Sequence, residues 1–101
     1  MKNSANIDEQ FFTLSEELFG DLRMLQSISP TRVEQLVDCV TGLAEKYEKF
    51  DVIPKNIAGE LFDVSTALYS AIDAYPEPQR QLLYGYFDSF CDSARSVFHS
   101  A

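Results

Sequence analysis

The sequence is poor in the residues on which most catalytic and metal sites depend. Its 101 residues include one histidine, two cysteines and no tryptophan, and its four glycines stand apart from one another. Two cysteines are too few for a disulfide framework, and their spacing is not that of a metal site. Separated glycines form no phosphate-binding loop. The one histidine, His99, is not placed to activate a serine. We therefore expect no enzyme, no catalytic residue, and neither a metal ion nor another cofactor.

Basic residues and long apolar runs are also scarce. Eight lysines and arginines stand against sixteen acids, which gives a net charge of −8. Direct nucleic-acid binding needs cations that displace counterions from phosphates, so we do not expect it. The negative charge favours a basic protein partner. No apolar run approaches the ~20 residues that cross a bilayer, and the first ten residues are polar and acidic, so neither a membrane span nor a signal peptide is expected. Together with two cysteines interpreted as reduced thiols, these features predict a cytoplasmic protein.

What the sequence does contain is helical periodicity. Apolar residues recur at steps of three and four in four segments, and none of these segments shows the two-residue alternation of a strand. All four prolines fall at the three joints between segments, as expected of helix ends. The predicted helices are roughly 7–27, 30–50, 56–75 and 78–98, with residues 1–5 and 99–101 expected to fray. Such helices joined by short turns predict a single all-α domain over residues 1–101, an antiparallel four-helix bundle.

The residues at the joints also indicate where the helices begin. Asn6 and Ser29 are suited to cap the first and second helices, because their side-chain oxygens accept from free N–H groups of the first turn. Asn56 is the corresponding candidate for the third helix. Pro78 is expected to open the fourth helix, since proline tolerates the first helical turn.

The two halves of the sequence partly coincide after a shift of 50 residues. Phe12 then falls on Phe62, and Phe19 falls on Tyr69. One interpretation is that any two amphipathic helices match once their apolar stripes are aligned. The other is a duplicated helical hairpin with pseudo-two-fold symmetry. Either would be a statement about architecture and not about chemistry.

A second aromatic stripe lies beside the main apolar stripe. Phe12 and Phe19 are seven residues apart, so they lie above one another on the first helix, and Phe62 and Tyr69 repeat this placement on the third. On the fourth helix the apolar arc is widened by Tyr84, Cys91 and Phe98. The stripe either closes the bundle as a third core position, or stays partly exposed and docks a partner or a second copy of the chain.

The acidic residues concentrate on the same two helices. Residues 1–28 and 51–75 each carry a charge of −3, and each of the other two segments carries −1. An aromatic anchor with an acidic rim would steer a basic partner by charge and then bury the rings. The predicted partner-binding residues are Phe12, Phe19, Phe62 and Tyr69, with Glu16, Asp63 and Asp73 as the acidic rim.

These features lead to a hypothesis of binding without catalysis. In size, charge and fold class the chain is similar to small acidic helical proteins that neutralise another protein, such as bacteriocin immunity proteins, antitoxins and phage-encoded inhibitors. It is also similar to small acidic chaperones of secreted proteins. No motif carries either similarity. The leading hypothesis is stoichiometric binding of a basic protein partner, and the alternative is a self-associating homodimeric structural module with no separate ligand. A nucleic-acid mimic and a carrier of a small apolar ligand are weaker alternatives.

Overall fold

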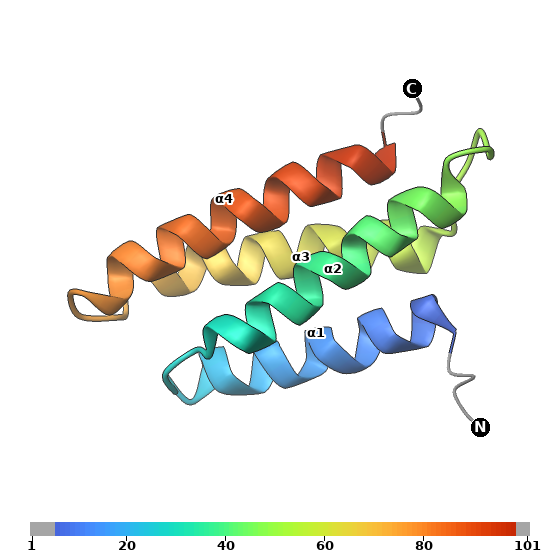
Figure 1. The fold of residues 1–101 in the computed structure, drawn as a ribbon. Coiled ribbons are helices and arrows are strands. Elements are labelled where there is room, and N and C mark those ends of the chain that lie inside the picture. Colours follow the sequence, from blue (N-terminus) through green and yellow to red (C-terminus); the bar gives the residue numbers. More distant parts are fainter. Residues whose placement is uncertain (1–5, 99–101) are drawn as a thin grey trace.

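Four α-helices make up the computed structural model, which describes residues 6–98. Their bounds are α1 (Ile7–Arg23), α2 (Pro30–Tyr47), α3 (Lys55–Ile72) and α4 (Gln79–Phe98) (Figure 1). Consecutive helices run in opposite directions, and the predicted all-α four-helix bundle is confirmed. Among these four helices, none has both the length and the apolar character needed to cross a bilayer. The fraying predicted for residues 1–5 and 99–101 concerns positions outside the described part.

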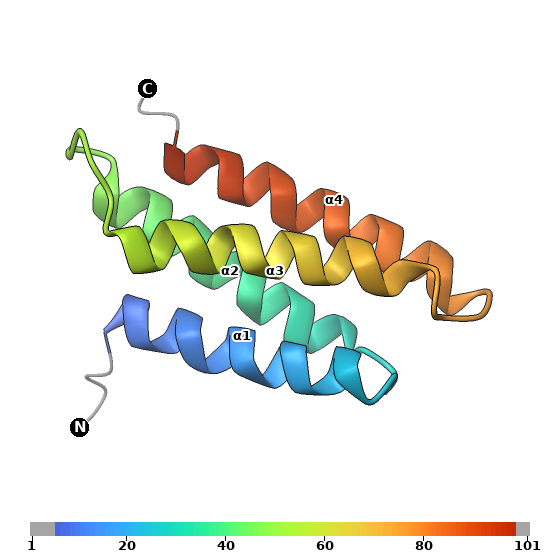
Figure 2. The same cartoon turned by 180° about the vertical axis from the view of Figure 1, so that it is seen from behind.

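The order of the helices around the bundle differs from their order in the chain. Among the described residues, α1 packs on α2 and α3, α4 packs on α2 and α3, and the most extensive contact is between α2 and α4. The consecutive helices α2 and α3 therefore lie at opposite corners. The α1–α2 and α3–α4 hairpins stand beside each other, with α1 next to α3 and running in the same direction (Figures 1 and 2). As a result, α3 has α1 on one side and α4 on the other.

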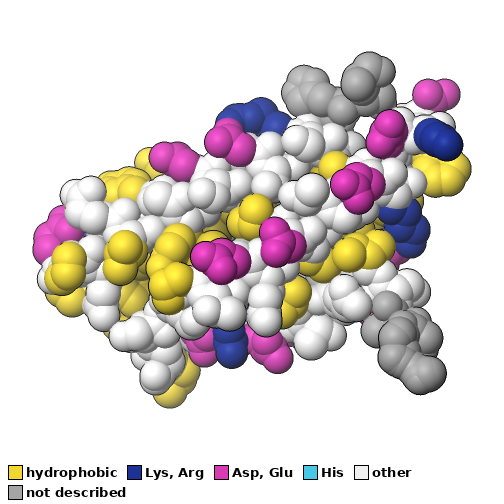
Figure 3. Space-filling model, in the orientation of Figure 1, with side chains coloured by type: hydrophobic (Ala, Val, Ile, Leu, Met, Phe, Trp, Pro, Cys, Tyr) yellow, Lys and Arg dark blue, Asp and Glu magenta, His cyan; other side chains and the backbone are white. Residues whose placement is uncertain are grey.

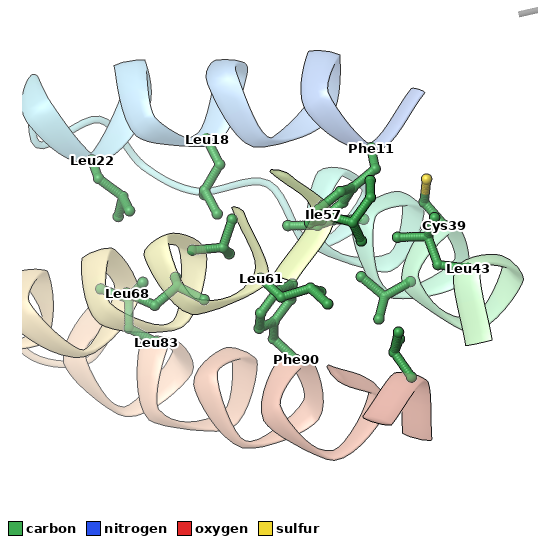
Figure 4. Packing of buried hydrophobic residues seen from close by; sticks show 14 of the residues in the cluster. Phe11, Leu18, Leu22, Cys39, Leu43, Ile57, Leu61, Leu68, Leu83 and Phe90 are labelled. Atoms are coloured by element: carbon green, nitrogen blue, oxygen red, sulfur yellow. The ribbon is translucent and has the colours of Figure 1, made fainter. Parts of the chain in front are cut away.

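The apolar stripes of all four helices meet in one core, as the periodicity predicts. Side chains from every helix point into the common interior (Figure 4). Twelve large side chains are almost fully buried there: Phe11, Leu18, Leu36, Val40, Leu43, Ile57, Leu61, Val64, Leu68, Ile72, Leu83 and Phe90. Full burial of one such side chain contributes about 1.5–3 kcal/mol, so this shared core is the main source of stability.

Two of the four predicted helix starts are capped as expected. The side chain of Asn6 accepts a hydrogen bond of 2.9 Å from the N–H of Glu9. The Ser29 hydroxyl accepts one of 3.4 Å from the N–H of Arg32. Both bonds satisfy a first-turn N–H that has no partner within the helix.

The other two helices start differently from the prediction. The prediction of Asn56 as a cap is wrong, because α3 begins at Lys55 and the Asn56 side chain accepts instead from the adjacent N–H of Ile57 at 3.0 Å. α4 begins at Gln79, one residue after Pro78, whose carbonyl accepts from the N–H groups of Gln81 and Leu82.

α1, α2 and α3 end three or four residues earlier than predicted. The periodicity continues past these ends because the turns also carry apolar residues. Tyr75 packs into the core from the turn after α3 and donates a hydrogen bond of 2.7 Å to the carbonyl of Gln26. Phe50, in the turn after α2, rests its ring 6.0 Å from that of Tyr47. An apolar period alone does not distinguish such turn residues from a further helical turn.

The end of α1 is a Schellman cap with leucine at the position where glycine is usual. The N–H of Gln26 bonds to the carbonyl of Asp21 at 2.9 Å, and the N–H of Leu25 bonds to that of Leu22 at 3.2 Å. Leu25 has φ = 53°, a left-handed conformation that crowds a Cβ atom. Its side chain is 55% exposed, so burial offsets little of this strain.

Leu25→Gly is therefore expected to stabilise the fold by about 1 kcal/mol, because glycine adopts the left-handed conformation without a Cβ clash. Thermal unfolding followed by circular dichroism should show a rise in Tm of about 4–8 °C. The neighbouring Met24→Gly is the control. Met24 has φ = −94°, so glycine there relieves no strain and should lower Tm. A Leu25→Gly variant that melts below wild type would contradict the claim that the backbone is strained at Leu25.

Polar contacts hold the start of α1 against α2. The Tyr47 hydroxyl donates a hydrogen bond of 2.8 Å to Asp8, and Lys46 forms an ion pair of 3.1 Å with the same carboxylate. The buried Cys39 thiol points at the carbonyl of Ile7, at 3.6 Å. Burial, and then the charge of Asp8, raise the pKa of the Cys39 thiol from 9.0 to about 11.

This pKa predicts a loss of stability in alkaline solution. Because folding raises the pKa, the thiol's contribution is complete below pH 9 and is lost as the pH rises to about 11. The loss amounts to roughly 2–3 kcal/mol. Urea unfolding at pH 8.5 and 11 should show a smaller decrease in Cys39→Ala than in wild type. Burial also raises the pKa of the half-buried Cys91 thiol, so Cys91→Ala is the comparison and should reduce the alkaline decrease less than Cys39→Ala does. An equal alkaline decrease in wild type and Cys39→Ala would show that Cys39 does not titrate in this way.

Candidate functional site

The seven predicted partner-binding residues are divided between two faces, because α3 lies between α1 and α4. One group lies along the α1–α3 side of the bundle: Phe12, Glu16, Phe19 and Asp63. The other group lies on the side of α3 that faces α4: Phe62, Tyr69 and Asp73. The single site expected from the sequence is therefore two surfaces, one on each side of α3.

The first surface is an open groove of about 380 Å³ between α1 and α3. We call it the α1/α3 groove, and it is lined by Phe19, Leu22, Arg23, Ala67, Ser70 and Ala71. Phe19 is half-buried because the two alanines of α3 leave room for its ring. Phe12, two turns earlier on the same side of α1, is also half-buried, and its ring lies 5.9 Å from that of Phe11.

Three carboxylates lie one to two turns away from the α1/α3 groove along the same two helices. This carboxylate cluster consists of Glu16 on α1 with Glu60 and Asp63 on α3. Partial burial, then the charge of Asp63 and then that of Glu16, raise the pKa of the Glu60 carboxyl. Among the described residues, none of the three takes part in an ion pair. The cluster is therefore a concentration of negative charge with which no described lysine or arginine forms an ion pair.

Glu60→Gln is expected to stabilise the folded protein at neutral pH, because it removes like-charge repulsion from a partly buried carboxylate. The gain should be about 0.5 kcal/mol, or a Tm higher by about 2–4 °C. Since folding raises the pKa of Glu60, ionisation disfavours folding above the ordinary value of 4.5. The gain in Tm should therefore disappear near pH 4.

The control is Glu34→Gln, which makes the same change in charge at an exposed position of α2. It should give no comparable rise in Tm at neutral pH. If the two variants behave alike, the effect comes from the overall charge of the protein and the local repulsion at Glu60 is disproved.

The second surface is an exposed array of rings on α3 and α4. Phe62 and Tyr69 are 69% and 64% exposed, although the sequence aligns them with the half-buried Phe12 and Phe19. The difference arises from the neighbouring helix. The centroid of the Tyr69 ring lies 5.3 Å from that of Phe87 of α4. On the α4 side of α3, Phe87 fills the space that corresponds to the one left open by the alanines on the α1 side.

Two residues of α4 extend this array along the seam between the helices. Tyr84 and Phe98 are 43% and 56% exposed, and Cys91, which is half-buried, lies midway between them on the same side of α4. We call the whole surface the α3/α4 aromatic face: the exposed Phe62, Tyr69, Tyr84 and Phe98, with the half-buried Phe87 and Cys91 among them. The repeated aromatic positions therefore have different surroundings in the two hairpins.

The charges beside the α3/α4 aromatic face are unevenly distributed. Asp73 follows Tyr69 by one helical turn and Asp88 follows Tyr84 by one turn, so two acids flank the half nearer the α3–α4 turn. Arg80 precedes Tyr84 by one turn on this half and donates a hydrogen bond of 3.1 Å to the carbonyl of Tyr75. Lys55 and Arg95 flank the half that contains Phe62 and Phe98. Arg95 also pairs with Asp92 of its own helix.

Other hollows and patches offer less. A surface hollow of about 1000 Å³ beside the start of α1 includes Phe12 and Cys39, but it is open, and the described residues that line it include acids and no base. Apolar side chains also gather where the α1–α2 and α3–α4 turns meet (Figure 3). The exposed residues there include Leu25 and Leu82. Within residues 6–98, no group of three or more His, Cys, Asp or Glu side chains could hold a metal ion.

Comparisons with known proteins add no family to this description. Neither a protein-family model, nor a curated protein, nor a solved structure matches the chain. The functional argument therefore depends on the two surfaces themselves.

The predicted partner-binding residues leave out several residues of these surfaces, among them Tyr84, Phe98 and Glu60. Tyr84 and Phe98 were recognised as widening the apolar arc of the fourth helix, but not as neighbours of Phe62 and Tyr69. Glu60 was not selected, although its spacing of three from Asp63 places both on one side of a helix. Only the packing of α1 on α3 brings Glu16 to them.

Proposed function

We propose that the protein is a stoichiometric binding module that takes a basic segment of a partner protein along the α1/α3 groove. The observation that carries the proposal is the carboxylate cluster beside an apolar groove. No described cation neutralises the cluster. A lysine or arginine of the partner would supply the missing charge, and an apolar partner residue would cover Phe19.

The net charge of −8 supports the same mechanism at longer range. A negative field raises the rate at which a basic partner arrives, and this effect weakens as salt screens it. Local carboxylates then orient the partner, and burial of apolar surface keeps it in place. Arrival of a cation at the cluster would also lower the pKa of Glu60 towards its ordinary value. Binding should therefore release protons near the pH at which Glu60 titrates in the free protein.

The module would act by occupying its partner, as an inhibitor, an antitoxin or a chaperone does. The choice among these depends on what the partner does when it is free. The proposed setting is cytoplasmic, in keeping with the two free thiols.

The proposal is tested by partner capture with two matched variants. Glu16→Gln combined with Asp63→Asn removes two exposed charges from the carboxylate cluster, and Glu34→Gln combined with Glu45→Gln removes two from α2. Wild type and both variants are immobilised and exposed to an extract of the source cells, and retained proteins are quantified by mass spectrometry. A basic protein should be retained by wild type and by the α2 variant, and about tenfold less by the cluster variant.

Salt provides the second measurement on the same captured protein. Its association rate should fall steeply between low and high ionic strength, because steering is screened. Equal loss in the two variants would assign the effect to net charge alone. Retention that is unaffected by the cluster variant would place the partner on another surface and reject the proposal.

A further inference from the structure

The α3/α4 aromatic face is distinct from the α1/α3 groove, and the proposed function does not use it. Its four exposed rings leave on the order of 400 Å² of largely apolar surface in contact with water. That is about half of what one partner contributes to a standard specific interface. The core of the bundle is complete without these rings, since each helix buries its own stripe. No part of the described bundle covers them, and a contiguous exposed apolar patch of this size is typical of a binding surface.

The aromatic positions on this face are arranged symmetrically about one level of the hairpin. On α4, Cys91 lies midway between Tyr84 and Phe98. On α3, the midpoint of Phe62 and Tyr69 falls next to Ser65. The contact of Tyr69 with Phe87 sets the two antiparallel helices in register. Ser65 lies four residues before Tyr69, and Cys91 lies four residues after Phe87. Because the two helices run in opposite directions, both midpoints lie at the same level along the hairpin.

We propose that the α3/α4 aromatic face binds a second copy of this chain, around a two-fold axis that runs across α3 and α4 at this level. The axis exchanges the two ends of each helix. Phe62 of one copy then meets Tyr69 of the other, and Tyr84 meets Phe98. The same surface patch serves both copies, as a closed dimer requires.

The charges beside the face agree with this axis. It brings Asp88 of one copy towards Arg95 of the other, because these residues lie three before and four after Cys91. It also brings Lys55 to within about three residues of Asp73 in the other copy. That offset is ~4.5 Å along a helix, which a lysine side chain spans. The acidic half of the face therefore meets the basic half.

The other two-fold arrangement, with the axis parallel to the helices, is disfavoured by the same charges. It would keep each half of the face against the same half of the second copy. It would lay α3 of one copy on α4 of the other, so Asp73 would lie on the same half of the interface as Asp88 of the second copy, which is repulsive. A basic partner is a poorer match to this face than to the α1/α3 groove, because Lys55 and Arg95 flank one of its halves.

Sedimentation equilibrium tests the dimer directly. Wild type should be a dimer of the 11.4 kDa chain, and Phe62→Ser combined with Tyr69→Ser should dissociate at least about a hundredfold more readily. The control is Phe50→Ser combined with Val52→Ser, which removes two exposed apolar side chains from the α2–α3 turn and should leave the dimer unchanged. Circular dichroism verifies that each variant is folded. A monomeric wild type, or a dimer that survives in the α3 variant, would overturn the proposal.

Charge exchange then tests the axis. Lys55→Asp alone and Asp73→Lys alone should each weaken the dimer, and the two together should restore it, because the pair is re-formed between copies. Failure of the combined variant to restore the dimer would overturn the proposed axis.

In a Cys39→Ala background, a short bismaleimide should join the two Cys91 thiols by addition across its double bonds. Absence of that cross-link in a folded dimer would also overturn the proposed axis.

Ionic strength separates this proposal from the function proposed above. Each copy carries −8, so screening of this repulsion by salt should offset the screening of the ion pairs between copies and leave the dimer little changed, whereas salt should weaken capture of a basic partner. The α3 variant that breaks the dimer should still capture that partner. Loss of both activities in the α3 variant would show that the two surfaces are one site and would overturn their separation.

Discussion

The position of α3 between α1 and α4 is the constraint on which both candidate surfaces depend. Because the chain passes from α2 to α3 across the bundle, α3 has a neighbour from the other hairpin on one side and its own hairpin partner on the other. The alanines on the α1 side leave room for Phe19 to become half-buried. On the α4 side Phe87 occupies the equivalent space and leaves Tyr69 exposed. One helix thus separates the α1/α3 groove, with the carboxylate cluster beside it, from the α3/α4 aromatic face.

The acids of α1 have two different relations to the rest of the fold. Asp8 and Asp21 pair with Lys46 and Arg32 of α2, so they help to hold the first hairpin together. Glu16 faces other carboxylates instead, and its proximity raises the pKa of Glu60. Repulsion of this kind lowers stability in the free protein, and residues that lower stability without a structural gain are characteristic of functional surfaces.

The apolar periodicity of the sequence was sufficient to predict the helices and the side of each helix that forms the core, and the residue types at the joints predicted the caps at Asn6 and Ser29. It was not sufficient to predict which helices become neighbours, since amphipathic stripes specify burial and not partners. Phe19 and Tyr69 occupy equivalent positions in the sequence, and only the side chains that oppose them determine their exposure. The predicted ends of α1, α2 and α3 were three or four residues too late. The cause is that turn residues such as Leu25 and Tyr75 continue the apolar period beyond the helices.

The most direct test of the account is whether the aromatic residues on the two sides of α3 respond separately. Aromatic ¹H–¹³C NMR spectra recorded over a series of protein concentrations would report on each ring. The account predicts that the resonances of Phe62, Tyr69, Tyr84 and Phe98 shift as the concentration rises, because a second copy covers them, while those of Phe12 and Phe19 stay in place. Spectra that do not change with concentration, or in which all six rings shift together, would contradict the division of the molecule into two surfaces.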